Sequence, residues 1–231
     1  MTEPTGDGTT KGERTRQRIL AAALELFREQ GYEATTMRLV AERAGVALGN
    51  AYYYFASKEL LLQEFYREVH TAHLTAVQPV LATRRSLEDR LRGVLHAWID
   101  VIAPYHRFAV LMFQTAADPK SPMNPFHTQN ASWRREGEAV FAQVLAGARV
   151  RVPKDLAQEL PGLLWTYRMG LLLFWMYDES PDHRRTRTLV DRTSDLVGRC
   201  IKLASNPLLR PLRKSVLATL RDVQTATLPA P

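Results

Sequence analysis

Residues 35–58 read TTMRLVAERAGVALGNAYYYFASK, and they carry more structural information than any other stretch of this chain. The pattern predicts two short helices joined by a turn at Gly45, because glycine has no Cβ to clash in a left-handed conformation. The helices are expected to pack through apolar side chains at helical spacing: Leu39, Val40, Ala44, Val46, Ala51 and Phe55. This arrangement is typical of a helix-turn-helix, which places its second helix in the major groove of DNA.

The second predicted helix has side chains that suit contact with DNA. Gly49 permits close approach of a phosphate to the helix start, where free N–H groups favour an anion. Asn50 offers its amide to a base edge or a phosphate. The three phenols at 52–54 are about 100° apart around the helix axis, so they cannot all be buried. The alternative is an ordinary helical hairpin with an aromatic core face.

A wider stretch, residues 15–65, resembles the N-terminal domain of TetR-family transcriptional regulators. The resemblance rests on TRQRILAAA at 15–23 and on Phe27, Gly31-Tyr32, Thr35-Thr36, Gly45-Val46, Gly49-Asn50-Ala51-Tyr52-Tyr53-Tyr54-Phe55 and Ser57-Lys58-Glu59. It implies an all-α homodimer with an N-terminal three-helix DNA-binding domain and a larger C-terminal helical domain for ligand binding and dimerisation. In such proteins a bound small molecule typically moves the two DNA-binding heads and releases the operator.

The resemblance also assigns DNA contacts by position. The matching residues are Thr36, Gly49, Asn50, Tyr52, Tyr53 and Lys58. Two further residues depart from the family pattern. Leu48 matches a contact site in position only, because Ala47-Leu48 stands where the family commonly has Ser-Lys. Tyr54 stands where the family frequently has His, and it completes the predicted set.

The chain is expected to divide into four segments. Residues 1–12 are polar and rich in Thr and Gly, which predicts a disordered tail. The DNA-binding domain is expected over 13–60, the ligand-binding and dimerisation domain over 61–206, and a C-terminal extension over 207–231. Helices outside the motif are predicted at about 15–30, 58–77, 87–103, 104–116, 128–146, 155–178, 185–204 and 212–223, with breaks at Pro79 and Pro153 and a loop at 118–126.

Net charge does not explain DNA binding directly. The chain carries +7, but its first 60 residues hold as many acidic as basic side chains. Within that part, Arg14, Arg16 and Arg18 form a cluster near the start of the first helix. They suit a basic arm that follows the phosphate backbone, and equally a solvated helix end.

The remaining composition predicts a cytoplasmic protein without enzymatic chemistry. A single cysteine, Cys200, allows no internal disulfide, and the sequence opens on no secretory signal. The most apolar run, 163–177, is too short to span a bilayer, so no membrane partner is expected. No catalytic motif, cofactor-binding motif or complete set of metal ligands is recognisable, although His70 and His73 share a helix face.

Two long helices, over 155–178 and 185–204, are expected to form half of a four-helix dimer interface, as the family resemblance also suggests. The first is apolar nearly all round, which requires a partner or a hollow to line. The predicted interface residues are Leu160, Leu164, Tyr167, Leu171, Leu189, Leu196 and Cys200. The alternative is the core of a monomer.

An effector pocket is predicted from bulky, adaptable apolar side chains spread over several helices. The candidates are Trp98, Phe108, Met112, Phe113, Trp133, Trp165 and Met169. For each of these residues taken singly, ordinary core packing is the alternative. The arginine excess favours an acidic or acyl ligand over a cationic one.

Together these patterns predict a ligand-responsive transcriptional repressor that binds a palindromic double-stranded DNA operator as a homodimer and is released by a hydrophobic small molecule. Two other readings stay open. One is a helical protein that organises DNA or binds partners without a ligand. The other is a small-molecule carrier with a vestigial DNA-binding head.

Overall fold

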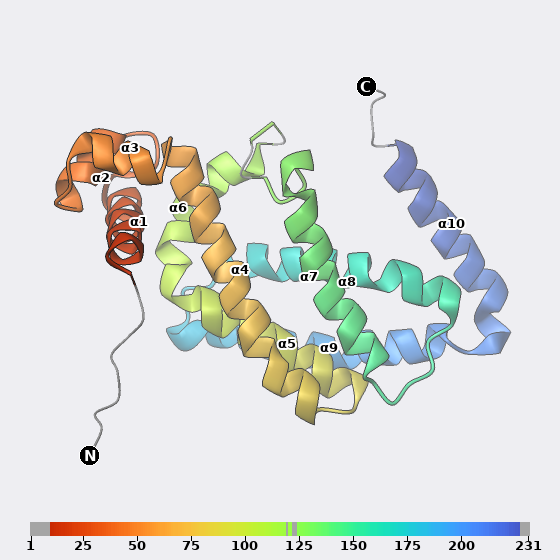
Figure 1. The fold of residues 1–231 in the computed structure, drawn as a ribbon. Coiled ribbons are helices and arrows are strands. Elements are labelled where there is room, and N and C mark those ends of the chain that lie inside the picture. Colours follow the sequence, from red (N-terminus) through yellow and green to blue (C-terminus); the bar gives the residue numbers. More distant parts are fainter. Residues whose placement is uncertain (1–9, 119, 122–123, 227–231) are drawn as a thin grey trace, which may run out of the picture. The chain divides into compact units, whose positions relative to one another are not determined.

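The computed structural model describes residues 10–118, 120–121 and 124–226 of this 231-residue chain. The described residues form ten α-helices and contain no strand (Figure 1), so the predicted all-α fold class is confirmed. In chain order the helices are α1 (Lys11–Gln30), α2 (Met37–Arg43), α3 (Leu48–Tyr54), α4 (Lys58–Thr83), α5 (Leu87–Ile102), α6 (His106–Ala117), α7 (Ala131–Ala146), α8 (Lys154–Met176), α9 (Arg184–Ala204) and α10 (Arg210–Ala226).

The chain forms two compact units, and α4 contributes to both. The described residues up to Thr71 and those within Tyr105–Asn124 form the first unit, which we call the head. The described residues within Ala72–Pro104 and from Pro125 onward form the second, which we call the body. This division differs from the predicted boundary at residue 60, because the first half of α4 and all of α6 gather with the motif.

The head has one apolar core, to which α1, α2, α3, α4 and α6 all contribute. Its most deeply buried side chains include Ile19, Phe27, Val40, Ala51 and Leu61. Phe108 of α6 belongs to this core: its ring centroid lies 6.1 Å from that of Phe27 and 5.0 Å from that of Phe65. The assignment of Phe108 to an effector pocket is therefore corrected, since its ring is used to hold α6 in the head.

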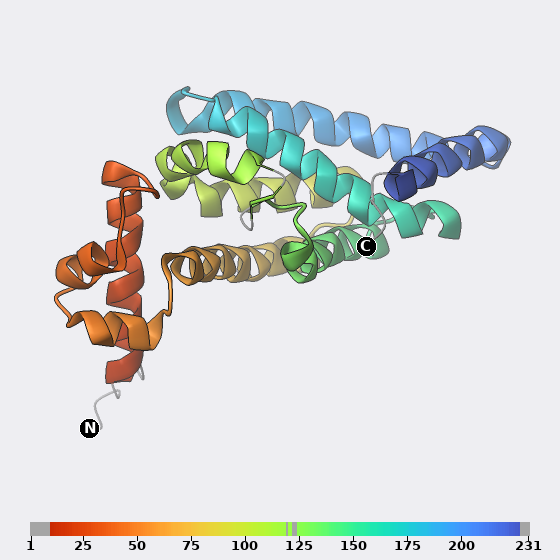
Figure 2. The same cartoon turned by 90° about the horizontal axis from the view of Figure 1, so that it is seen from above.

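The body is a bundle in which α7 packs on α8, α5 packs on α9, and α8 also contacts α9 (Figure 2). Large side chains such as Leu91, Ile99, Phe141 and Trp175 are completely buried in it. The predicted C-terminal extension is mostly helix α10, with 227–231 outside the described residues. The Arg213 side chain links α10 to the body through Asp155 at 3.1 Å and the Ala204 carbonyl at 2.8 Å.

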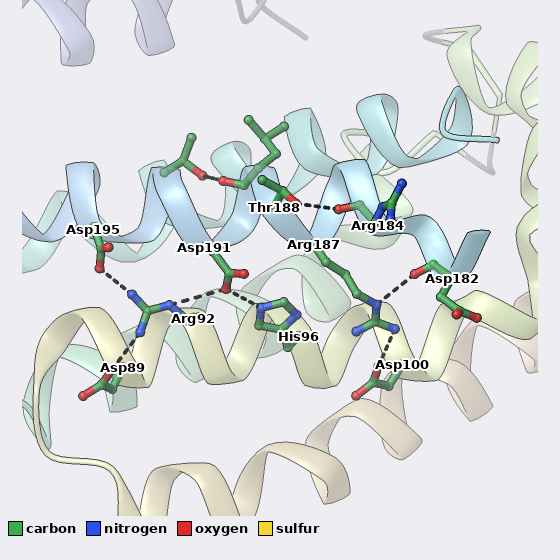
Figure 3. Close-up of polar contacts among 12 residues, drawn as sticks. Asp89, Arg92, His96, Asp100, Asp182, Arg184, Arg187, Thr188, Asp191 and Asp195 are labelled. Carbon is green, nitrogen blue, oxygen red and sulfur yellow. Dashed lines mark hydrogen bonds and ion pairs between the residues drawn. The ribbon is translucent and has the colours of Figure 1, made fainter. Parts of the chain in front are cut away.

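A row of charged side chains aligns α5 with α9 (Figure 3). Arg92 of α5 forms ion pairs with Asp195 and, at 3.5 Å, with Asp191 of α9. His96 Nε2 lies 2.8 Å from Asp191 Oδ1, and Arg187 of α9 lies 2.7 Å from Asp100 of α5. A shift of one helix by a turn would break these pairs and could bring Asp100 of α5 opposite Asp191 of α9, so the pairs favour the observed register.

The turn between α8 and α9 depends on a buried carboxylate. Asp178 is 2% exposed and accepts hydrogen bonds from the Thr186 backbone and hydroxyl at 2.7 and 2.6 Å. Ser180 donates two more, at 3.0 and 2.6 Å. Burial raises the pKa of Asp178, but these hydrogen bonds outweigh burial and bring its pKa well below the ordinary value.

Three helix boundaries differ from the sequence predictions. The break expected at Pro79 is wrong: α4 continues to Thr83, and proline, which lacks an N–H, removes only one backbone hydrogen bond there. Helix α1 starts at Lys11 because the Thr10 hydroxyl caps it, accepting from Glu13 N at 3.2 Å. The predicted tail thus includes Lys11 and Gly12, the first two residues of α1, and 1–9 lie outside the described residues. A short 3-10 turn at Ala103–Tyr105 precedes α6, which begins at His106.

Candidate nucleic-acid interface

Helices α2 and α3 form the expected two-helix motif around Gly45. Thr36 caps α2, its hydroxyl accepting from Leu39 N at 3.3 Å. Gly45 has a φ of 64°, in the left-handed region that favours glycine. The next residue returns to α2, because Val46 N donates to the Ala41 carbonyl at 3.0 Å. Buried Ala51 then places α3 against the head core with its opposite side outward.

The outward side of α3 consists of Gly49, Asn50, Tyr52 and Tyr53, all exposed. Tyr53 is 81% exposed and Tyr52 is 48% exposed, so these phenols are large aromatic groups in contact with solvent. A hydroxyl at the tip of an exposed ring donates to phosphate, and the ring contacts a thymine methyl group. The hairpin alternative, which needs the phenols as core, does not account for these two.

Gly49 is not required by the packing of the chain. A Cβ placed on it would have no atom within 4 Å, and its backbone is in an ordinary helical conformation. Glycine inside a helix costs about 1 kcal/mol relative to alanine. The absent side chain therefore leaves room for something outside this chain, as a close phosphate would require.

The first turn of α3 also has no side-chain cap. Its N-cap residue is Ala47, whereas α1, α2 and α5 are capped by the hydroxyls of Thr10, Thr36 and Ser86. The N–H groups at the start of a helix then depend on water or on a ligand. In this exposed position they are suited to an anion, because the helix dipole is positive there.

Three predicted contact residues are engaged within the head. Leu48 and Tyr54 are half-buried and pack against the head core, and the Tyr54 ring meets the Tyr53 ring edge-on at 5.2 Å. The aliphatic Leu48 side chain has no hydrogen-bond donor for a phosphate, so its match to a family contact site stays one of position only. Lys58 Nζ donates to the Tyr32 carbonyl at 3.0 Å and lies 4.2 Å above its ring.

The basic side chains near the motif have different surroundings. Arg16 pairs with Glu64 and lies 5.0 Å from the Phe55 ring, so it is neither a free arm nor a solvated helix end. Arg14 and Arg18 are exposed, which is expected both for a basic arm along DNA and for a solvated helix end. Arg38, the second residue of α2, is also exposed. We add Arg38 as a candidate for contact with a phosphate. Its position opposite the apolar side chains of the predicted helix could have indicated this from the sequence.

The predicted effector residues divide between the two units. Trp98, Trp133, Trp165 and Met169 belong to the body, whereas α6, which carries Phe108, Met112 and Phe113, belongs to the head. The Met112 side chain lies outside what the structure describes. Within the body, Trp98 and Trp165 are 6% and 4% exposed, and both lie beside the buried Arg168.

The predicted dimer residues also divide. Leu160, Leu164 and Leu171 are 3–6% exposed within one chain, so they have little surface left for a second copy. This part of the prediction is corrected: their side of α8 faces the body's own core. Tyr167 and Leu189 are half-buried, whereas Leu196 is 59% exposed and Cys200 is exposed. The exposed apolar side chains near them are Leu173, Phe174, Tyr177 and Leu203.

A groove between α4 and α5 of the body has both charged and apolar walls, with Arg92, His96 and Asp100 beside Ala76 and Val80, and Trp98 and Trp165 do not line it. Among the described residues, no three His, Cys, Asp or Glu side chains are grouped as metal ligands. No helix in the same part of the chain combines the length and apolar character that crossing a membrane requires.

Comparison with known proteins identifies two regions of this chain. Residues 19–65 match the family described as bacterial regulatory proteins, tetR family. Residues 90–217 match the tetracyclin repressor-like C-terminal domain. The HTH-type transcriptional repressor KstR2 of Mycolicibacterium smegmatis is 29% identical over 145 residues, which cover 61% of this chain and 70% of that protein. The fatty acid metabolism regulator protein of Bacillus subtilis is 27% identical over 93 residues, covering 40% of this chain and 48% of its own.

Solved structures share the fold. The TetR transcriptional regulator from Nitrosomonas europaea superposes with a TM-score of 0.61 at 20% identity, covering 79% of this chain and 97% of that one. The fatty acid degradation regulator FadR from Bacillus halodurans superposes with a TM-score of 0.62 at 16% identity, covering 85% and 97%. At these identities the likeness concerns architecture only.

Proposed function

Because this chain belongs to the TetR family of transcriptional regulators, we propose that α3 binds an operator and that two copies of the chain bind its two half-sites. The observation that carries this proposal is the outward side of α3. It combines an unneeded glycine, an uncapped first turn and two exposed phenols. Each feature is unfavourable or neutral for the free protein, and each is useful against a phosphate backbone and base edges.

The experiment begins with selection of bound DNA from a random pool, followed by gel shifts of the selected sequence. Tyr53→Ala is expected to weaken binding at least about fivefold, since a good base contact contributes about 1–3 kcal/mol. Tyr53→Phe separates the hydroxyl from the ring, and Leu208→Ala, an 86% exposed residue of the body, is the control. If the Tyr53 variants bind the selected DNA as well as the parent does, α3 is not the reading helix.

Salt provides a second test of the same proposal. A protein that neutralises several phosphates releases counterions, so its affinity falls steeply as salt rises. The slope of log affinity against log salt concentration measures this effect. Arg38→Met is expected to reduce the slope by about one while leaving the preference for DNA sequence unchanged. A slope that is shallow in the parent protein would argue against phosphate contacts at the head.

The proposed dimer uses the exposed stripe on α8 and α9, not the buried leucines. Leu196 and Leu203 lie on α9, and Phe174 and Tyr177 lie at and just after the end of α8. Burying such a stripe against a second copy removes apolar area from water. Leu196→Arg is expected to give a monomer in sedimentation, whereas Leu60→Arg, on an exposed site in the head, leaves the dimer intact. A dimer that survives Leu196→Arg places the interface elsewhere.

We further propose an apolar effector and a repressor that acts in the cytoplasm without catalysis. The aromatic side chains of the body support the effector, and the name of the Bacillus subtilis relative, a regulator of fatty acid metabolism, favours an apolar compound. The test is release of the selected DNA by candidate compounds. A chain that binds compounds but no DNA would favour a carrier instead.

A further inference from the structure

The body contains three arginines that are at most 9% exposed, and they differ in their partners. Arg90 donates to four carbonyls, those of Val144, Gln143, Leu81 and Arg84, at 2.7–2.9 Å. Arg213 donates to the Asp155 carboxylate and to the Ala204 carbonyl. The burial of these two guanidinium groups is explained by their hydrogen bonds, which hold helix ends together.

Arg168 of α8 has no such partners. It is 7% exposed, its Nε has no hydrogen-bond partner, and no carboxylate among the described residues forms an ion pair with it. Aromatic faces lie beside it: the guanidinium carbon lies 5.6 Å from the Trp98 ring and 5.8 Å from the Phe141 ring. A buried cation of this kind is unfavourable, because ring faces only partly replace the water it has lost.

The group nevertheless stays charged at neutral pH. Burial lowers the pKa of Arg168 to about 10, which is still far above 7. The guanidinium therefore keeps an unmatched positive charge inside an apolar bundle. Unpaired buried charges of this kind are found where function needs them, since packing alone would favour an aliphatic side chain.

The helices around Arg168 are shaped to leave it room. α7 carries Gly137 opposite the group, where a Cβ would come within 3.0 Å of Arg168 Nη2 and 2.9 Å of the Trp165 ring. Trp165 precedes Arg168 by one turn of α8, so both side chains lie on the same face of that helix. Trp98 from α5 and Phe141 from α7 complete an apolar wall around one cationic head.

We propose that Arg168 is the anchor for the carboxylate of an amphipathic effector whose apolar body lies against Trp98, Phe141 and Trp165. A carboxylate matches the guanidinium fork in two parallel hydrogen bonds, and it supplies the charge that the chain lacks at this position. The proposal rests on the proposed function, because it assumes that the body takes an effector. It narrows that effector to an apolar acid.

Two matched probe pairs test the charge requirement. Dodecanoate is compared with dodecan-1-ol, and naphthalene-2-carboxylate with 2-naphthol, by quenching of tryptophan fluorescence in the full-length protein. At least one carboxylate is expected to bind at least about tenfold more tightly than its alcohol, since a charge-assisted pair is strong away from water. If neither acid binds, or if each alcohol binds as tightly as its acid, the proposal is overturned.

Two variants test the residue. Arg168→Met removes the charge but keeps the length, and Arg135→Met removes an exposed arginine of α7 as the control. Arg168→Met is expected to abolish the preference for acid over alcohol while its melting temperature stays equal or rises, because an unmatched charge has been removed. A clear fall in melting temperature together with unchanged acid preference would make Arg168 a packing residue and overturn the proposal.

Gel shifts on the selected DNA distinguish failure of the proposed DNA-binding function from failure of the Arg168 proposal. If the protein binds no DNA, the proposed function fails whatever the probes do. If it binds DNA but only alcohols or a cation such as dodecyltrimethylammonium release it, the regulator stands and the Arg168 proposal alone fails.

Discussion

Arg16 of α1 and Glu64 of α4 form a two-point ion pair across 48 residues of sequence, Nη1 to Oε1 at 2.8 Å and Nη2 to Oε2 at 2.6 Å. The Glu64 side chain is 10% exposed and is also held by Arg67. The same Arg16 guanidinium lies 5.0 Å from the ring of Phe55, the residue that ends α3. One side chain thus connects the first helix, the candidate reading helix and the helix that enters the body.

Removing the charge of Glu64 is expected to loosen the head. Glu64→Gln keeps the shape but weakens hydrogen bonds to two arginines, and hydrogen bonds to charged groups contribute about 1.5–3 kcal/mol each. The variant should therefore unfold at a lower temperature and denaturant concentration than the parent. Glu42→Gln, an exposed carboxylate of α2, is the control, and equal stability of both variants would contradict the role of the pair.

The difference between the parent and Glu64→Gln is expected to depend on pH. Burial raises the pKa of Glu64, but hydrogen bonds from Arg16 and Arg67 bring it below the ordinary value. A carboxylate with a depressed folded-state pKa stabilises fully above its unfolded pKa, about 4.3, and loses that contribution as pH falls further. The stabilities of the parent and of Glu64→Gln, measured by unfolding from pH 7 to pH 3, should become more similar as pH falls. A difference that grows toward pH 3 would contradict the depressed pKa of Glu64.

Gly49→Ala is expected to change stability and DNA binding in opposite directions. The added Cβ meets no atom of the chain, and alanine is the better helix former, so the variant should gain about 0.5–1 kcal/mol of stability. The same methyl group occupies the space proposed for a phosphate, so the gel shift should show weaker binding. A variant that is more stable and binds equally well would remove Gly49 from the interface.

Asp178→Ala is expected to destabilise the turn between α8 and α9. Four hydrogen bonds to the buried carboxylate are lost, which leaves the donors of Ser180 and Thr186 unsatisfied. Such losses cost about 1–3 kcal/mol for each buried group left unpaired. Because the pKa of Asp178 is depressed, the difference from the parent should be largest near neutral pH and shrink below about pH 4. Melting curves at several pH values measure both expectations.

Arg90→Met provides the counterpart to Arg168→Met. Arg90 donates to carbonyl groups at the ends of α4 and α7, and its replacement removes one donor from each of four acceptors, of which Gln143 keeps the Gly147 N–H. A fall of several degrees in melting temperature is expected, since each buried unsatisfied group costs about 1–3 kcal/mol. If Arg90→Met and Arg168→Met prove equally harmless, the contrast between the two buried arginines has no energetic meaning.

Local features were predictable from the sequence because they depend on neighbours a few residues away. The left-handed turn at Gly45 and the all-α class follow from short-range sterics and hydrogen bonding. The family itself could be identified from the motif for the same reason. The exposure of Tyr53 was also expected in part, because three consecutive phenols on a helix cannot all face one core.

Similar side chains could be told apart only once the folded chain was known. In the sequence, Arg16, Arg90 and Arg168 look alike, yet Arg16 pairs with a carboxylate, Arg90 caps helix ends, and Arg168 has no ion-pair partner within the described part of the chain. Leu160 and Leu196 both fit an apolar stripe, yet one is buried and the other is 59% exposed. Burial and ion pairing depend on elements far apart in the chain, such as α1 with α4 or α5 with α7, and no local pattern encodes which of them meet.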